Sequence, residues 1–479
     1  MLVRGPPLGK RTPLCVDLDG TLSPVDTLHE QALHALGSWA HVLGMARSIW
    51  WGRAAVKQYL ADAVPFSAER LPYHDGLLQW LLEERSAGRR LVLVTGANEA
   101  LARAVARHLG IFDEVVASDA RINLKGGIKA QRLVDRFGER GFAYVGNDAS
   151  DMWVWKRAAS AILVGAQPAL ARAAAQAVPV ERAFPRERHQ ILRSLIKALR
   201  PHQWLKNVLV FVPIVTARAF GDTAGWRASV AVFLAFCALA SSAYPINDLA
   251  DLSSDRAHAV KRRRPIAAGE VSVLLALLLA ASLSITGMGL AWLAGAPLVG
   301  LAYLVGTILY STVLKTLAIV DVFALGGLYT VRVIAGGQAS GHLVSEWLLA
   351  FSGFLFLSLG AMKRVAELRA RGAAAGASRR RPYQPDDARF LEFLGMGASV
   401  TSALVLALYA QAHTAGATRS AGSMALWLVS PVMLFWQMRL WLSTFRGFML
   451  EDPLAYAARD WVTRLAGVLV AALFVLSGL

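Results

Sequence analysis

Apolar residues are distributed differently before and after about residue 200. In the first part, apolar runs are short and broken by charged residues, whereas in the second part they reach the roughly 18 to 25 residues that cross a bilayer. This pattern predicts a soluble N-terminal domain followed by an all-helical membrane domain. Nine membrane spans are expected, at roughly 206–220, 228–247, 271–289, 295–314, 319–337, 347–361, 393–412, 423–442 and 463–479.

Composition agrees with a membrane-embedded part. The chain has 479 residues, 55% of them apolar, and a mean hydropathy of +0.44, which is too apolar for a soluble protein of this length. The net charge of +17 could point to nucleic acid. However, the basic residues cluster beside the spans and no nucleic-acid motif is present, so no nucleic-acid partner is expected. Two distant cysteines exclude a disulfide framework and a cysteine-based metal site.

Basic residues also predict the orientation. The N-terminus lacks the continuous apolar stretch of a signal peptide, so the first domain is expected to stay in the cytoplasm. The inside loops are then 248–270, 315–318, 362–392 and 443–462, and they hold nearly all the basic residues of this half. The outside loops hold only Arg218, Arg227 and Arg419. The asymmetry predicts a multi-pass protein of the inner, cytoplasmic membrane with its active sites in the cytoplasm and its C-terminus outside.

The loop after the second predicted span carries the most informative polar motif. Asp248, Asp251 and Asp255 are spaced i, i+3 and i+7, which would put them on one face of a helix with Asn247 at its edge. Such an oxygen cage suits Mg²⁺. A solvated acidic face that caps a helix is the alternative. The basic residues that follow suit the other side of a bound pyrophosphate, and they are Arg256, Lys261 and Arg264.

The segment from Asn247 to Gly269, with the nine predicted spans and a second polar segment at 310–336, resembles the UbiA superfamily of membrane prenyltransferases over residues 200–479. One branch is most similar, the decaprenyl-phosphate phosphoribosyltransferases, which use phosphoribosyl pyrophosphate and a polyprenyl phosphate. The resemblance implies substrate-binding roles for Lys206, Asn207, Asn247, Arg256, Lys261, Arg264, Tyr310, Lys315, Asp321, Tyr329, Arg332, Lys363 and Arg364. It also implies that Asp248, Asp251 and Asp255 are catalytic and hold Mg²⁺ together with Asn247.

One departure from ordinary UbiA prenyltransferases bears on the donor. Those enzymes carry a second Asp-x-x-x-Asp cluster after the fourth span, whereas this chain has Asp321 and then Tyr329 and Arg332. The departure argues against a prenyl pyrophosphate and for a smaller pyrophosphate ester whose own phosphate is held by basic residues. Two alternatives stay open. One is a prenyltransferase that moves an isoprenoid to an aromatic acceptor beside an accessory phosphatase. The other is a transporter or channel, which leaves the aspartate loop unexplained.

The soluble part holds four polar motifs at the ends of short buried segments. Asp17 and Asp19 follow the first strand and precede a Gly20-Thr21 turn, and Thr95 ends the second strand. Lys129 opens a helix. The fourth motif contains Asn147, Asp148 and Asp151. In an α/β sheet, strand ends such as these meet at one edge, where ligands bind.

This set resembles the haloacid-dehalogenase phosphohydrolase superfamily over residues 10–180. The resemblance implies a Rossmann-like α/β fold in which Asp17 is the nucleophile and Asp19 the acid/base, while Thr95 and Lys129 hold phosphoryl oxygens. It implies Mg²⁺ on Asp17, the Asp19 carbonyl and Asp151. Asn147 stands where the family has an acid, so Asn147 ligates through its amide oxygen or Asp148 replaces it. A decayed, merely regulatory domain is the alternative.

The expected domains are the phosphatase at 1–185, a charged linker at 186–199 and the membrane transferase at 200–479. A small helical cap is expected at about 26–90. Its tryptophans, Trp39, Trp50 and Trp51, could pack in the cap core or dock on lipid headgroups, and core packing is favoured.

The predicted activity has two steps. The membrane domain transfers 5-phosphoribose from phosphoribosyl pyrophosphate to a decaprenyl-like polyprenyl phosphate, and the soluble domain then removes the 5-phosphate. The resemblance to the phosphoribosyltransferase branch implies that the product is polyprenyl-phosphoryl-ribose, an arabinose precursor for the cell envelope. One Mg²⁺ is expected in each domain, the membrane is the expected partner surface, and a homo-oligomer is compatible with the sequence.

Overall fold

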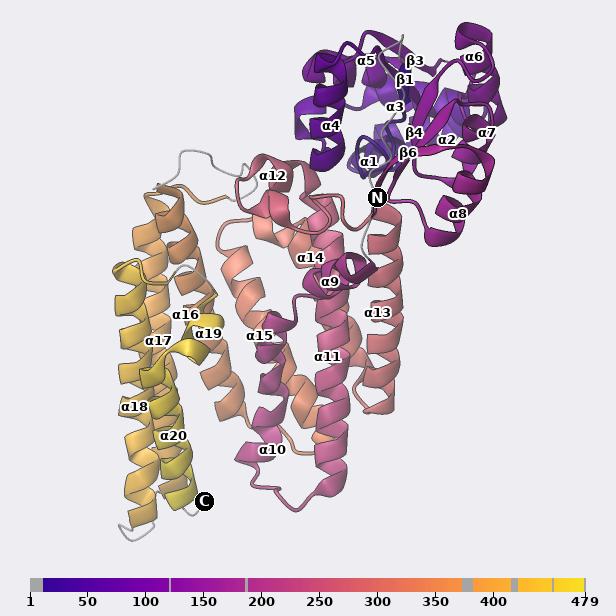
Figure 1. Cartoon of the computed structure of the whole chain (residues 1–479). Helices are drawn as coiled ribbons and strands as arrows, with labels where there is room; N and C mark the ends of the chain where they lie inside the picture. The colour runs from indigo at the N-terminus through magenta and orange to yellow at the C-terminus, as the bar shows by residue number, and fades with distance from the viewer. Residues whose placement is uncertain are drawn as a thin grey trace. The chain divides into compact units, whose positions relative to one another are not determined.

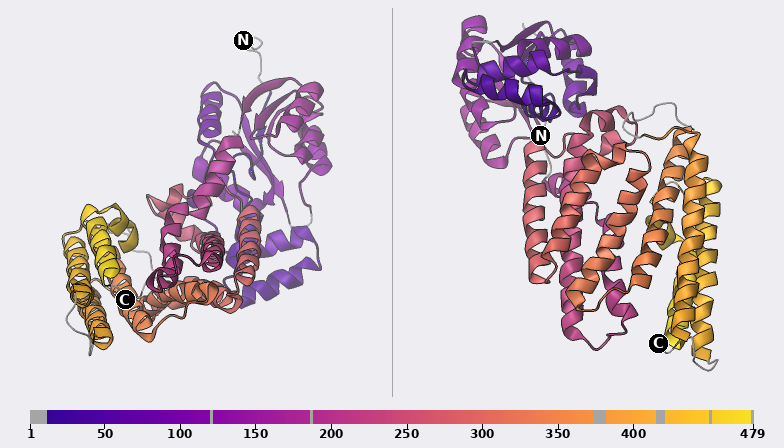
Figure 2. Two further views of the ribbon diagram at one scale, coloured as in Figure 1. Left: turned by 90° about the horizontal axis from the view of Figure 1, so that it is seen from below. Right: turned by 180° about the vertical axis from the view of Figure 1, so that it is seen from behind.

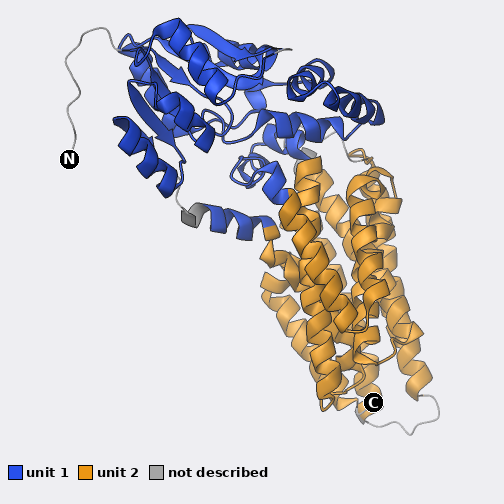
Figure 3. Ribbon diagram, turned by 90° about the vertical axis from the view of Figure 1, so that its right-hand side faces the viewer, with its two compact units in different colours: residues 1–198, 251–276 blue, residues 199–250, 277–479 orange. Residues whose placement is uncertain are grey.

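The computed structural model describes residues 12–119, 122–185, 188–372, 382–414, 421–449 and 452–477. The chain divides into two compact units, coloured separately in Figure 3. The N-terminal unit comprises Met1–Ala198 and Asp251–Ala276, and the membrane unit comprises Leu199–Ala250 and Leu277–Leu479. The division near residue 199 lies close to the predicted start of the transferase. The grouping of Asp251–Ala276 with the N-terminal unit was not expected from the sequence.

A six-stranded parallel sheet forms the centre of the N-terminal unit, with the strand order β3-β2-β1-β4-β5-β6 (Figure 1). The strands are β1 Leu14–Val16, β2 Leu91–Asn98, β3 Glu114–Ser118, β4 Ala143–Gly146, β5 Ser160–Val164 and β6 Val180–Phe184. Chain order reverses between β1 and β4, so these two central strands form the switch point where doubly wound sheets bind ligands. The predicted Rossmann-like α/β fold is confirmed.

Successive residues of each strand point to opposite faces of the sheet, and both faces are buried. Leu14 and Val16 of β1 belong to one core cluster, whereas Cys15 between them belongs to the other. Two groups of helices cover these faces, and parallel strands buried in this way read as continuous apolar runs. The covering helices are α4 Asp75–Ser86, α5 Glu99–Leu109, α6 Gly127–Phe137, α7 Met152–Trp155 and α8 Pro168–Ala177. The helix that follows β6, α9 Arg188–Leu199, contributes none of its described residues to either core cluster.

The cap between β1 and β2 is smaller than predicted. It consists of α1 Thr27–Ala35, α2 Trp39–Ile49 and α3 Arg53–Ala63, which share a small core built on Ala35, Leu60 and Val64. Helix α4, which the prediction placed in the cap, instead packs Leu77, Trp80 and Leu81 into the core of the sheet.

The favoured core packing of the cap tryptophans is wrong. Trp39, Trp50 and Trp51 are 83%, 91% and 84% exposed. Trp39 is the first residue of α2, and Trp50 and Trp51 directly follow its last residue, Ile49.

The segment 251–276 folds onto the N-terminal unit. It contains α12 Leu252–Ala257 and the 3₁₀ turn η4 Lys261–Arg263. Arg256 donates two hydrogen bonds to Glu30 of α1, and Ser194 donates one of 2.6 Å to Glu270. Gly269 has φ +74°, and a Cβ atom at this position would lie 2.8 Å from Pro24 and from Val25. The close approach therefore requires glycine.

Helix geometry corrects one expectation about the aspartate motif. Helix α11 ends at Ala250, and α12 begins at Leu252 after Asp251 as its N-cap. Asp248, Asp251 and Asp255 therefore do not share one face of a continuous helix.

The membrane unit is helical, and seven helices among the described residues are long and apolar enough to cross a membrane. These seven are Thr223–Ala250, Val273–Leu293, Pro297–Thr316, Val320–Ser340, Glu346–Arg369, Asp387–Thr414 and Gly422–Phe445. The predicted span at 206–220 is instead a 3₁₀ segment, η3 Pro201–Phe211, followed by α10 Val212–Thr216. The last predicted span is a shorter apolar helix, Trp461–Leu476. The count of nine is thus not confirmed, and the inside–outside orientation stays a prediction.

Helix bounds in this unit are α11 Thr223–Ala250, α13 Val273–Leu293, α14 Pro297–Thr312, η5 Leu314–Thr316, α15 Val320–Ser340, α16 Glu346–Gly372, α17 Asp387–Thr414, α18 Ala421–Phe445, α19 Pro453–Arg459 and α20 Trp461–Leu476. Helices α17, α18 and α20 lie side by side in both views of Figure 2. Large apolar side chains on α13 are exposed, among them Leu278, Ile285 and Leu293. Such surfaces are usual where helices face lipid.

We expect Gly269→Ala to loosen the segment 251–276, because the added methyl group meets Pro24 and Val25 and the backbone keeps a positive φ. Gly295→Ala is the matched control, since Gly295 has φ +73° with no neighbouring atom within 4 Å. The melting temperature and the rate of proteolysis within 251–276 are measured on both full-length variants. Equal effects of the two substitutions would contradict the close packing.

Candidate active sites

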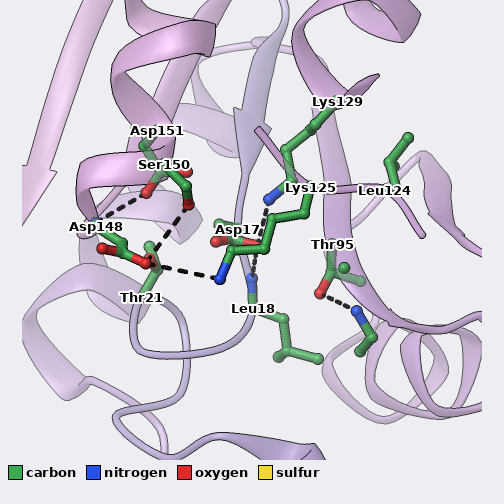
Figure 4. A network of polar contacts seen from close by, with 12 residues as sticks. Asp17, Leu18, Thr21, Thr95, Leu124, Lys125, Lys129, Asp148, Ser150 and Asp151 are labelled. Carbon is green, nitrogen blue, oxygen red and sulfur yellow. Dashed lines mark hydrogen bonds and ion pairs between the residues drawn. The ribbon is translucent and has the colours of Figure 1, made fainter. Parts of the chain in front are cut away.

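The first site lies at the carboxyl end of β1. Asp17 follows this strand, and its Oδ1 atom accepts hydrogen bonds of 2.9 Å from the Leu18 amide and from the Lys129 ammonium group (Figure 4). The same ammonium group donates to the Tyr144 hydroxyl at 2.9 Å. Tyr144 in turn donates to Asp151 at 3.0 Å. Three of the four predicted motifs, those of Asp17, Lys129 and Asp151, are therefore joined by one chain of buried hydrogen bonds.

The two aspartates of the first motif have raised pKa values. Burial raises the pKa of Asp17 to about 7, even though Lys129 opposes the shift. Burial and the nearby Asp26 raise the pKa of Asp19 to about 6, against the hydrogen bond that Asp19 accepts from the Thr27 amide. A carboxyl group with a pKa near 6 can both give and take a proton close to neutral pH. This property suits the acid/base role implied for Asp19.

The fourth motif is organised by Asp151. Its Oδ2 atom accepts the backbone amides of Asn147 and Asp148 at 2.9 and 3.0 Å. Asn147 also accepts a hydrogen bond of 3.1 Å from the Thr21 hydroxyl, and a Cβ atom on Gly20 would lie 2.4 Å from its amide nitrogen. Asp151 thus fixes the backbone of Asn147 and Asp148, while the side chain of Asn147 packs against the Gly20-Thr21 turn that follows β1.

A cavity of about 600 Å³ opens over these residues, which is ample for a sugar phosphate. Its lining includes Asp17, Asp19, Lys129, Asn147 and Asp148. The predicted phosphate ligand Thr95 is fully buried in β2, where its hydroxyl accepts the Ala97 amide at 3.0 Å. Thr95 is therefore placed to shape the end of β2, and the residues after it line the cavity.

Two further parts of the chain line the same cavity and were missed from the sequence. Lys57 of the cap donates to the Gly96 carbonyl and, at 2.8 Å, to Asn123, and burial lowers its pKa. A single lysine on a short helix gives no sequence signal of such a role. Ser272 and Leu274 also line the cavity from the end of the segment 251–276.

The residues at this site fit Mg²⁺. Among the described residues, no three His, Cys, Asp or Glu side chains form a group that could hold a metal by themselves. However, Mg²⁺ usually takes one or two carboxylates and completes its shell with water and substrate phosphate. The Asp17 and Asp148 carboxylates and the Asn147 amide supply hard oxygen donors to one cavity. Asp151 is 2% exposed and already accepts three hydrogen bonds, so it supports the site from behind.

The aspartate motif of the second site is paired with arginines. Asp248 is buried and accepts a hydrogen bond of 2.5 Å from Arg200. Asp255 is buried and accepts one of 2.6 Å from Arg264. Asp251 lies at the junction between α11 and α12. Carboxylate oxygens are the donors that Mg²⁺ prefers, but among the described residues these three aspartates do not form a group that could hold a metal by themselves.

Three other residues predicted beside this motif have defined positions. Arg256 is bound to Glu30, so its guanidinium group supports the segment 251–276 rather than facing a pyrophosphate. Lys261 lies in the 3₁₀ turn η4. Asn247 accepts a hydrogen bond of 3.1 Å from Lys315, which brings two predicted residues together.

A cluster around Asp452 gathers several predicted residues in the membrane unit. Asp452 accepts Lys206 at 2.6 Å, Lys363 at 3.3 Å and the Tyr329 hydroxyl at 3.4 Å. Burial alone would raise the pKa of Asp452, but Lys363 and Lys206 outweigh burial and hold it well below its usual range. Two cations on one carboxylate leave a net positive charge, which suits an anionic substrate.

Arg332 adjoins the cluster. It donates to Asn207 and to the Tyr303 hydroxyl, both at 2.8 Å, and its guanidinium group lies 5.5 Å from the Tyr329 ring centre. The structure brings together five predicted residues, Lys206, Asn207, Tyr329, Arg332 and Lys363. The pair Asp452-Pro453 resembles a motif of the phosphoribosyltransferase branch but was not predicted to have a role in the site, and Tyr303 was not predicted. Asp452 is also the N-cap of helix α19, where its carboxylate accepts a hydrogen bond of 3.2 Å from the Leu454 amide. Aspartate is common at this position for purely structural reasons.

A second buried cluster centres on Arg364. Its guanidinium group donates to Asp321 and Glu367 at 2.6 Å and also to the Tyr310 hydroxyl. Asp321 accepts a further 2.6 Å bond from Tyr383, which sequence reasoning missed. Arg364 and Asp321 are almost completely buried. This pair therefore positions α15 against α16, and a direct substrate contact by Arg364 does not fit its burial.

Known families match both parts of the chain. The UbiA prenyltransferase family matches residues 208–446, and the haloacid dehalogenase-like hydrolase family matches residues 14–154. The chain belongs to the UbiA prenyltransferase family. It carries a haloacid dehalogenase-like domain at its N-terminus and is an integral membrane protein.

Individual relatives cover either the whole chain or its UbiA domain. The protein y4nM of Sinorhizobium fredii is 36% identical over 98% of this chain and 91% of its own length, so the same two-part arrangement occurs elsewhere. Decaprenyl-phosphate phosphoribosyltransferase of Mycolicibacterium smegmatis is 37% identical over 43% of this chain and 66% of its own length. A UbiA homologue from Archaeoglobus fulgidus, solved with GPP and Mg²⁺, is 17% identical with a TM-score of 0.45, over 60% of this chain and 98% of that chain.

We expect Asp321→Asn to destabilise the UbiA domain by about 3 to 5 kcal/mol, because it breaks the buried ion pair with Arg364 and leaves that arginine only the partly exposed carboxylate of Glu367. Glu367→Gln is the control. Glu367 is the other acidic partner of Arg364, and its side chain is 33% exposed. Melting temperatures of the full-length variants in detergent are compared. If Asp321→Asn melted like the control while its binding of substrate collapsed, the pair would be part of the binding site instead of a structural support.

Proposed function

We propose that this protein transfers 5-phosphoribose from phosphoribosyl pyrophosphate to a polyprenyl phosphate and then removes the 5-phosphate, yielding polyprenyl-phosphoryl-ribose. The proposal builds on the two families that match the chain, which indicate a UbiA-type transferase joined to a haloacid dehalogenase-like phosphatase. The relatives named decaprenyl-phosphate phosphoribosyltransferase support the substrates.

The observation that carries the choice of donor is the burial of Asp321. A prenyl pyrophosphate donor would call for a second accessible acidic cluster in this part of the sequence. Asp321 is instead enclosed, with its two oxygens accepting hydrogen bonds from Arg364 and Tyr383. The adjoining cluster offers Lys206 and Lys363, which share the single carboxylate of Asp452. Basic side chains such as these suit the 5-phosphate of a phosphoribosyl donor.

In the transfer step, the phosphate oxygen of the lipid attacks the anomeric carbon of the ribose. The bond from that carbon to the pyrophosphate oxygen breaks, and inorganic pyrophosphate leaves with the electron pair. Asn247, Asp248, Asp251 and Asp255 would hold Mg²⁺, whose charge would stabilise the leaving group. The attacking phosphate is already anionic at neutral pH, so no strong general base is required.

In the second step, Asp17 attacks the phosphorus atom of the 5-phosphate and forms an aspartyl-phosphate. Asp19 gives its proton to the departing ribose oxygen and then takes one from the water that hydrolyses the intermediate, releasing inorganic phosphate. Lys129 compensates the charge of Asp17 at 2.9 Å and is placed to stay near the transferred phosphoryl group. Asp17, the Asp19 carbonyl, Asn147 and Asp148 would hold the Mg²⁺ of this domain.

The phosphatase cavity favours a membrane-bound substrate. Ser272 and Leu274 line it, and Leu274 belongs to α13, one of the candidate spans. A lipid product that stays in the same membrane meets the tethered phosphatase at a high effective concentration. We place the protein in the cytoplasmic membrane with both active sites on the cytoplasmic side, on the basis of the charge asymmetry of the loops.

The transfer step is tested with phosphoribosyl pyrophosphate that carries ¹⁴C in the ribose, purified protein and polyprenyl phosphate. We expect the label to enter the lipid phase with the wild-type protein. Asp248→Asn should abolish this transfer, because it removes one charged oxygen ligand, while hydrolysis of a soluble phosphate ester persists.

Retained hydrolysis and an unchanged melting temperature serve as the folding controls for Asp248→Asn. Label that stays in the aqueous phase with the wild-type protein, together with transfer from a labelled prenyl pyrophosphate to an aromatic acceptor, would contradict the proposed donor and support the ordinary prenyltransferase reaction. Normal phosphoribosyl transfer by Asp248→Asn would contradict the role of the aspartate motif.

A further inference from the structure

Helix α2 of the phosphatase cap presents an apolar stripe to solvent. Trp39, Leu43, Ala46 and Trp50 follow one another at i, i+4, i+7 and i+11, which places them on one face of the helix, and all four are exposed. The inner side of α2 is satisfied separately, since Met45 packs against the small cap core. Among the described residues, no side chain covers the stripe. Burial of apolar surface would therefore favour an external partner.

The chemistry of this segment suits a lipid headgroup layer. Tryptophan is enriched where membrane proteins cross the boundary between lipid and water, because its ring is apolar and its N–H group is polar. Residues 39–53 contain Arg47 and Arg53 but no aspartate or glutamate. Helix α2 carries one arginine, Arg47, and no carboxylate beside its tryptophan-bearing apolar side, and Arg53 follows at the start of α3. Amphipathic helices without negative charge suit an anionic membrane surface.

Contacts inside the N-terminal unit hold the cap beside a membrane-entry point. Glu30 of the cap helix α1 binds Arg256 in the segment 251–276, which connects the two spans α11 and α13. Arg53 and Val56 of α3 line the same cavity as Leu274 in the first turn of α13. A segment that joins two spans must stay close to the bilayer surface, so its partners in the cap are kept close to that surface as well.

We propose that the α2 stripe, formed by Trp39, Leu43, Ala46 and Trp50, lies in the headgroup layer of the bilayer that the UbiA domain spans. The cap then has two attachments, the Glu30–Arg256 pair and the lipid surface. Because α3 follows α2 directly and lines the phosphatase cavity, docking of the stripe keeps the mouth of that cavity at the membrane surface. A phosphate ester carried on a lipid could enter it without leaving the bilayer.

The test measures how deeply the stripe is immersed, using full-length protein in nanodiscs of phosphatidylglycerol and phosphatidylcholine that hold one copy each. A nitroxide label is attached at Leu43→Cys and, in a second variant, at Trp50→Cys; both native cysteines are buried. The matched control is Ile128→Cys on α6, because Ile128 and Leu43 are similarly exposed, at 56% and 64%. Collision rates of the label with oxygen and with a water-soluble nickel chelate are recorded.

We expect the ratio of oxygen to nickel collisions to be several-fold higher at positions 43 and 50 than at position 128. Labels placed one by one along 39–50 should give maxima that repeat every three to four residues. Equal ratios at 43, 50 and 128 would overturn the proposal. Shielding that appears only in nanodiscs holding two copies would also overturn it and would assign the stripe to a contact between copies. No turnover is involved, so the outcome is independent of the proposed phosphoribosyl reaction.

Discussion

Charged side chains enclosed among membrane helices need partners of opposite charge, and this requirement governs the UbiA domain. Lys206 and Lys363 share Asp452, and Arg364 is enclosed by Asp321 and Glu367. Unpaired, each of these charges would cost several kcal/mol in such surroundings. The two clusters differ in outcome. Around Arg364 two carboxylates face one cation, whereas around Asp452 two cations share one carboxylate.

The same requirement shapes the phosphatase site. Asp17 is buried, and its burial is tolerated because Lys129 lies 2.9 Å away and Tyr144 links that lysine to Asp151. The pKa of Asp17 is nevertheless raised to about 7. Both domains thus place one carboxylate and a compensating cation at the point where a phosphate group is expected.

Residues that carry local chemistry could be read from the sequence, whereas contacts between distant segments could not. Asp17 and Lys129 were predicted because strand ends and helix starts leave local signals, and the structure brings them together. Tyr144 lies in an apolar strand segment, so the sequence carries no sign that its hydroxyl links Lys129 to Asp151. The exposure of Trp39 was misjudged because periodicity fixes which residues share a face but not what that face contacts.

The membrane half shows the same limit. Individual spans follow from length and hydropathy, but the 3₁₀ segment Pro201–Phe211 could not be told from a span, since apolar composition is similar in both. The break at Asp251 was equally hidden, because the spacing of the aspartates fits an unbroken helix. Asp321 was predicted to bind substrate, and only three-dimensional packing reveals that Arg364 and Tyr383 enclose it.

The central claim is that the product of one domain is the substrate of the other, and a doubly labelled donor tests it most directly. Phosphoribosyl pyrophosphate with ¹⁴C in the ribose and ³²P in the 5-phosphate is supplied with polyprenyl phosphate to wild-type protein and to Asp17→Asn. The account predicts that wild-type lipid retains ¹⁴C while ³²P is released as inorganic phosphate, and that Asp17→Asn lipid retains both labels in equal proportion. Equal loss of ³²P from the lipid made by both proteins would contradict the account.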